Sequence, residues 1–79
     1  MKVKVLELDK KLYDGEALKV LVPAVEGEMC LLPNHISIVT SLGAGRICIF
    51  RPDSDRPISI NVKGGICSFS DNNAVFILE

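Results

Sequence analysis

Turn-forming residues interrupt this chain so often that no helix of ordinary length fits between them. Clusters of Pro, Gly, Asn and Asp recur roughly every 8 to 12 residues, which is the spacing of short strands in a sandwich or barrel. The stretch 20–40 shows the pattern most densely, with an apolar strand, a Pro-Ala-Val-Glu-Gly turn, a second apolar run, a Pro-Asn-His turn and a β-branched strand. The apolar runs alternate with period 2 rather than 3.6, so the sequence predicts strands throughout.

The expected fold is all-β, an antiparallel sandwich or barrel of about eight to ten short strands. Alternation changes phase after Val5, which predicts a β-bulge or register change there. Asp14-Gly15 is a strong turn dipeptide and is expected to end the second strand. We expect strands at 1–8, 10–13, 17–22, 28–32, 36–40, 46–51, 58–62, 66–70 and 74–78.

The size and charge of the chain restrict its function. Its 79 residues form one domain, 1–79, with no room for a second core. Such a chain buries only about 60% of the surface that its unfolded form exposes, so its size favours a permanent partner. Nine basic and ten acidic residues with no basic block argue against nucleic-acid binding, because phosphates require a basic patch. No apolar run approaches the roughly 18 residues of a membrane-spanning helix.

Three cysteines, Cys30, Cys48 and Cys67, form an odd, widely spaced set, which is typical of reduced thiols in a cytosolic protein. Cys30 and His35 could act as nucleophile and base, but no signature supplies a third group to orient the base. A zinc site formed by the cysteines and His35 would lack the usual close ligand pairs. All three cysteines fall in apolar runs, so we expect core residues, with no catalytic residue and no metal site.

Two glycine segments and one lysine suggest other functions only weakly. No helix is expected after Gly64-Gly65 or after 43–45, so neither is expected to bind phosphate, and no cofactor is expected. Asp9-Lys10 faintly resembles the hairpin lysine of lipoyl or biotinyl carrier domains, although it lies near the start of the chain. Glu26 and Glu28 either keep a turn soluble or form an acidic rim for a cationic partner, and the residues alone do not choose between these.

Several segments occur in a distinctive order and spacing: LYDG at 12–15, VPAVEGEMCLLPNH at 22–35, TSL at 40–42, G-x-I at 45–47, KGGI at 63–66 and NAVFIL at 73–78. Together they resemble the N-terminal domain of the ε-subunit family of F-type ATP synthases over nearly the whole chain. The chain departs from that family at Ala24, Cys30 and Asn34, where glycine is usual. Asn34 tolerates the left-handed backbone of a turn glycine, whereas Ala24 disfavours it, so a different turn type is expected near Ala24.

The resemblance implies a flattened β-sandwich in the central stalk, which couples proton flow to ATP synthesis and does no chemistry itself. Its partners would be the γ subunit, the c-ring and, indirectly, the α/β catalytic head. It would lie at the cytoplasmic face of the bacterial inner membrane, held there only through the complex. By position, Gly27, Glu28 and Met29 would face the c-ring, and Glu7, His35, Ile38 and Leu42 would lie toward γ.

Members of the resembled family usually continue into a C-terminal pair of helices that carries inhibition and the response to ATP. The present sequence stops at Glu79, so neither function is expected from these residues. Two other classes remain open from the residues: a lipoyl- or biotinyl-type carrier domain and a free-standing β-barrel binding module.

Overall fold

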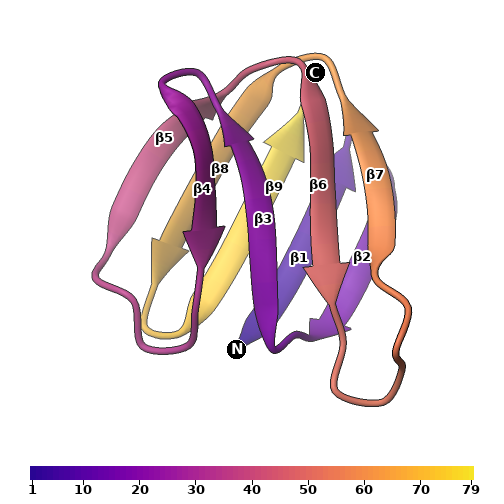
Figure 1. Cartoon of the computed structure of the whole chain (residues 1–79). Helices are drawn as coiled ribbons and strands as arrows, with labels where there is room; N and C mark the ends of the chain where they lie inside the picture. The colour runs from indigo at the N-terminus through magenta and orange to yellow at the C-terminus, as the bar shows by residue number, and fades with distance from the viewer.

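The computed structural model describes residues 1–79 as nine strands without a helix, joined into one curled sheet (Figure 1). The all-β prediction is confirmed, and every expected strand is present, although several bounds differ. The strands are β1 (Lys2–Glu7), β2 (Lys10–Glu16), β3 (Lys19–Ala24), β4 (Gly27–Leu31), β5 (Ile38–Leu42), β6 (Gly45–Phe50), β7 (Ile58–Val62), β8 (Gly65–Ser70) and β9 (Asn73–Leu78). No helix long and apolar enough to cross a membrane is present.

The sheet folds over into two layers that face each other across the core (Figure 1). One layer contains β4, β3, β6 and β7, and the other contains β5, β8, β9, β1 and β2. They join where β5 meets β3, through the single pairing of Leu42 with Ala24. All neighbouring strands are antiparallel except β1 and β9, which pair in parallel although they come from opposite ends of the chain. The result is a two-layered sandwich.

The core contains the inward-facing residues of both layers. Sixteen apolar residues are buried there, and no polar or charged residue is. Alternation is clearest in β8. Cys67 and Phe69 are fully buried in the core, whereas Ile66 points outward to solvent. Fully burying a large apolar side chain contributes about 1.5–3 kcal/mol. This alternation fixes which residues of each strand remain available on the outer faces.

The bulge predicted near Val5 is confirmed, because the register between β1 and β2 shifts between Val5 and Leu6. By contrast, the turn predicted at Asp14-Gly15 is wrong. β2 continues through both residues to Glu16, and the connection to β3 comes later, at Ala17 and Leu18. The dipeptide is a strong turn signal only when the flanking strands pair across it, and here the flanking strand pairs with β1.

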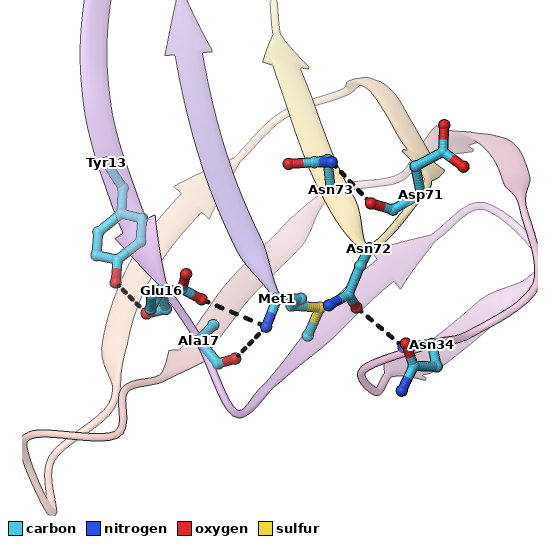
Figure 2. Close-up of polar contacts among 8 residues, drawn as sticks. All are labelled: Met1, Tyr13, Glu16, Ala17, Asn34, Asp71, Asn72 and Asn73. Carbon is cyan, nitrogen blue, oxygen red and sulfur yellow. Dashed lines mark hydrogen bonds and ion pairs between the residues drawn. The ribbon is translucent and has the colours of Figure 1, made fainter.

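Gly15 pairs with Val3 inside β2, and the Tyr13 side chain occupies the space that a larger residue there would need. A Cβ atom at Gly15 would lie 3.1 Å from the hydroxyl oxygen of Tyr13. That hydroxyl donates a hydrogen bond to the carbonyl oxygen of Glu16 at 2.8 Å (Figure 2). Close by, the Met1 ammonium donates to the Ala17 carbonyl oxygen at 3.1 Å and lies 3.5 Å from the Glu16 carboxylate. These contacts fasten the start of β1 to the end of β2.

Two asparagines tie the β4–β5 loop to the β8–β9 turn. Asn34 has a φ of 66°, as expected for an asparagine that stands where a turn glycine is usual. Its backbone N–H donates to the side-chain oxygen of Asn72 at 2.9 Å (Figure 2). Ala24 lies in β3 rather than in the turn itself, and its partner Gly27 takes the positive φ of 130°.

Candidate functional site

Residues from both expected partner-binding sets meet in one cross-strand row. Gly27 pairs with Ala24, Ala24 with Leu42, Leu42 with Gly65, Gly65 with Leu78, and Leu78 with Glu7. The row crosses both layers at the end where the β3–β4, β5–β6 and β7–β8 connections and the C-terminus lie, which is the upper end in Figure 1. Neighbouring strands are about 4.8 Å apart, and the row crosses six of the nine strands. We call this end of the sandwich the upper end.

The start of β4, just after the β3–β4 turn, exposes the carboxylate of Glu28. Gly27 begins β4, and a Cβ atom there would meet nothing within 4 Å, so the backbone is open to a partner. Glu28 is exposed and forms neither an ion pair nor a side-chain hydrogen bond. Met29 packs against the core and anchors the strand. Gly27 and Glu28 are therefore exposed side by side, whereas the Met29 side chain faces the core.

The upper end has a small excess of acidic side chains. Its carboxylates, Glu7, Asp9, Glu26, Glu28 and Glu79, exceed its bases, Lys10, Lys11, Arg46 and Lys63, by one. Charge complementarity steers association and sets specificity at low salt. A partner loop with basic side chains suits the exposed Glu28 at this end.

The residues expected to lie toward γ are divided between the two ends of β5. His35 and Ile38 lie at the end opposite the upper end, where the edge of the His35 ring contacts Phe69 with centroids 6.0 Å apart. The His35 Nδ1 atom lies 2.7 Å from the Ile36 carbonyl oxygen, to which it can donate. Leu42 closes the other end of β5, is only 4% exposed and pairs with Ala24 on one side and Gly65 on the other, so a partner would reach little of it.

Sequence reasoning missed an apolar surface on the outside of the β5–β8–β9 layer. Val39 of β5 is 73% exposed, Ile66 of β8 is 51% exposed and Ile77 of β9 is 55% exposed. A shallow hollow of about 440 Å³ adjoins Ile66 and Ile77. The sequence did carry a signal, because 74–78 is apolar at every position, whereas a strand with one solvated face usually alternates. We call Leu6, Val39, Ile66, Val75 and Ile77 the apolar face.

The expectation that all three cysteines are core residues holds only in part. Cys67 is fully buried, and burial raises the pKa of its thiol to about 12. Cys48 is half-buried, and Cys30 is exposed. Cys30 pairs with Leu21 on the outer side of β4, an edge strand whose outer face nothing covers. The chain has no cluster of three or more His, Cys, Asp or Glu side chains able to hold a metal ion.

Comparison with known proteins identifies one family. A family model described as ATP synthase, Delta/Epsilon chain, beta-sandwich domain matches residues 1–79. An ATP synthase epsilon chain of Neisseria meningitidis serogroup C is 33% identical over 79 residues, which are 100% of this chain and 56% of that protein. The ATP synthase epsilon chain of Leptospira interrogans serovar copenhageni is 37% identical over 100% of this chain and 61% of its own length. The chain therefore spans little more than half of these relatives.

Two solved structures share the fold. A chain in the Euglena gracilis mitochondrial ATP synthase OSCP/F1/c-ring structure superposes with a TM-score of 0.87 at 18% identity, over 96% of this chain and 48% of that one. A chain in the Tetrahymena thermophila mitochondrial ATP synthase central stalk/c-ring structure gives a TM-score of 0.82 at 12% identity, over 98% and 61%. Neither is a lipoyl or biotinyl carrier, so the carrier alternative gains no support.

Proposed function

The chain belongs to the family of ATP synthase Delta/Epsilon chain beta-sandwich domains, whose model covers all its residues, and on that premise we propose that it is a coupling domain of the central stalk. In this role it binds the γ subunit and the c-ring and helps proton flow to drive ATP synthesis. It contacts the α/β catalytic head only indirectly and does no chemistry itself. It lies at the cytoplasmic face of the bacterial inner membrane, held there through the complex.

The match over the whole chain carries this proposal, and the arrangement of the upper end supports it. Gly27, Glu28 and Met29 form the contact with the c-ring. Glu28 is exposed and unpaired at the upper end, so it suits a loop with basic side chains. The comparison covers 56% of the Neisseria chain, so the remaining 44% of that protein lies outside the residues compared.

The γ subunit, in this proposal, lies along β5. His35 and Ile38 contact it at one end of β5, and Glu7 contacts it from β1, three strands away in the same layer and at the other end of that layer. Leu42 acts mainly by holding the strand in place, because it is buried between Ala24 and Gly65. A partner along β5 would also cover exposed apolar surface that a domain of this size otherwise leaves in water.

Isolation of the complex tests the assignment. We expect the tagged chain, expressed at its native level, to recover α, β, γ and c subunits from detergent-solubilised membranes of the source cell. Recovery of none of them with soluble tagged chain present would contradict the proposal and favour a free-standing binding module. This measurement is independent of which surface touches which partner.

Reversing the charge at Glu28 tests the c-ring contact. We expect Glu28→Lys to lower ATP-driven proton pumping relative to ATP hydrolysis in reconstituted vesicles, because a favourable charge contact becomes a repulsive one. A close like-charge pair across an interface costs several kcal/mol. Asp55→Lys makes the same change in an exposed loop at the opposite end and should leave coupling unchanged. Equal coupling in both variants would exclude Glu28 from the contact.

A further inference from the structure

We propose that the free edge of β7 is a self-association site, at which two copies of this chain pair their β7 strands in antiparallel. The β4–β3–β6–β7 layers of the two copies then form one continuous sheet. A two-fold axis passes through the middle of the pair, so that Ile60 lies opposite Ile60 of the second copy. This goes beyond the proposed function, because it concerns the domain by itself and uses a border of the sandwich away from β5 (Figure 1).

β7 has a neighbour on one side only. It pairs with β6 from Ile58 to Val62, and no strand lies beyond it in the sheet. Every second residue of an edge strand directs its N–H and C=O groups away from the neighbouring strand. No backbone hydrogen bond outside the strand ladders and no side-chain hydrogen bond involves residues 58–62. These groups are therefore free to pair with another strand.

The other two edge strands carry features that discourage such pairing, whereas β7 does not. β2 pairs only with β1, across a register shift, and has four charged side chains: Lys10, Lys11, Asp14 and Glu16. β4 pairs only with β3, begins with a glycine and carries Glu28. The sequence of β7 is Ile-Ser-Ile-Asn-Val, without charge, proline or glycine. Charges, bulges and prolines are the usual means by which an edge strand avoids another chain, so β7 is the edge suited to receive one.

The sequence of β7 is complementary to itself when it is reversed. In an antiparallel pair centred on Ile60, Ile58 lies opposite Val62 of the second copy, and Ser59 lies opposite Asn61. The three apolar residues form the inner side of the strand, and Ser59 and Asn61 are exposed on its outer side. Apolar side chains therefore meet on one face and hydrogen-bonding side chains on the other, with no like charges opposite each other. A second copy of this chain supplies the required pattern without any further partner.

The inner side of β7 also has apolar surface left to bury. Ile58 and Ile60 pack against the core but are only partly buried. By contrast, Ile47 and Ile49 on the inner side of β6, which has a neighbour on each side, are fully buried. The difference follows from the position of β7 at the edge of its layer. A second β7 strand would cover the exposed part of both isoleucines, and removal of apolar surface from water favours association.

The contact is small, which determines how strong and how large the assembly is. Only five residues of each copy pair, fewer than the about 20–30 residues a side of a standard interface. We therefore expect a weak, reversible dimer that forms at high micromolar to millimolar concentration. Because the two-fold pair uses the free β7 edge of both copies, association should stop at the dimer.

Sedimentation velocity of the purified chain, from micromolar to millimolar concentration, tests the site with two double variants. The mass of the unmodified protein should rise from that of a monomer toward that of a dimer and no further. Ser59→Lys with Asn61→Lys places like charges opposite each other across the two-fold axis and should weaken association about tenfold or more. The matched control is Ser59→Lys with Asn61→Asp. It places opposite charges at the same positions and should dimerise at least as strongly as the unmodified protein at low salt.

Amide hydrogen exchange in the same samples locates the contact. Alternate amides of β7 should exchange rapidly in the monomer and become protected as the dimer forms. A mass that stays monomeric up to millimolar concentration contradicts the proposal, and so does a dimer whose β7 amides remain unprotected. Growth beyond the dimer would mean that β7 pairs with a different edge rather than with itself, which also overturns the two-fold pair. Protection of these amides in a monomer at every concentration would mean that another part of the same chain covers the edge, and would exclude the second copy.

Two controls keep these results interpretable. Thermal melting by circular dichroism checks that both double variants fold, and if either unfolds, the concentration dependence of exchange in the unmodified protein decides the question. Recovery of the ATP synthase subunits from membranes is measured separately. Failure of the dimer therefore leaves the proposed function unchanged, and failure of the proposed function leaves the dimer unchanged.

Discussion

Replacing Gly65 with alanine should destabilise the domain more than any other single glycine substitution. Gly65 begins β8 at φ 143°, a conformation that is essentially restricted to glycine. A Cβ atom there would overlap the Ile77 carbonyl oxygen and lie 3.0 Å from the Leu78 Cα. Both contacts are backbone atoms of the adjacent strand, so no side chain can rotate away to relieve them.

The expected magnitude has two parts, and the chain offers a control for each. Gly27→Ala isolates backbone strain, since φ is 130° and a Cβ there would meet nothing within 4 Å. Strain of this kind costs about 1–3 kcal/mol. Gly65→Ala adds overlap with the neighbouring strand, a further 1–3 kcal/mol or so. Gly43→Ala has neither feature, since its closest contact is 3.6 Å, and should change stability by less than about 0.5 kcal/mol.

Urea unfolding followed by far-ultraviolet circular dichroism measures these differences. A domain of this size has a free energy of unfolding of roughly 4–12 kcal/mol, so Gly65→Ala removes a large part of it. The urea midpoint should be highest in Gly43→Ala, lower in Gly27→Ala and lowest in Gly65→Ala. If Gly65→Ala loses no more stability than Gly27→Ala, the overlap with β9 is relieved by a backbone shift and the reasoning is refuted.

Two further predictions concern ionisable side chains. Burial raises the pKa of Tyr13, against an opposing effect of Arg51. Because the folded-state pKa is the higher one, stability is retained below the unfolded value of about 10 and is lost as the pH rises above it. The urea midpoint should therefore fall less steeply in Tyr13→Phe than in the unmodified protein above about pH 10. For the thiols, a labelling reagent near pH 8 should modify exposed Cys30 first and buried Cys67 only on unfolding. A fast phase that persists in Cys30→Ser would contradict the placement of Cys30.

The sequence alone predicted the class of fold and the position of each strand. The bulge after Val5 followed from alternation, which is a local property of successive residues. The left-handed backbone at Asn34 likewise followed from the residue itself. The family resemblance depended on the order of short motifs, and the match over residues 1–79 confirms it.

Turn chemistry was less reliable than alternation. Asp14-Gly15 has the composition of a turn but lies in β2, because pairing with β1 and the space needed by Tyr13 outweigh the local preference. Cys30 lies in an apolar run of the sequence, as a core residue would, but its side chain is exposed. Exposure depends on whether another element covers that side of the strand. In both cases long-range contacts decided the outcome.

The tertiary structure alone determined how the site is assembled. The parallel pairing of β1 with β9 brings Glu7 into the same cross-strand row as Leu42 and Gly27, which are distant in sequence. It also places Lys4 between Val75 of β9 and Asp14 of β2. Periodicity states which side chains of a strand share a face, but it carries no information on which strands become neighbours. That choice is made by the packing of the two layers around one core.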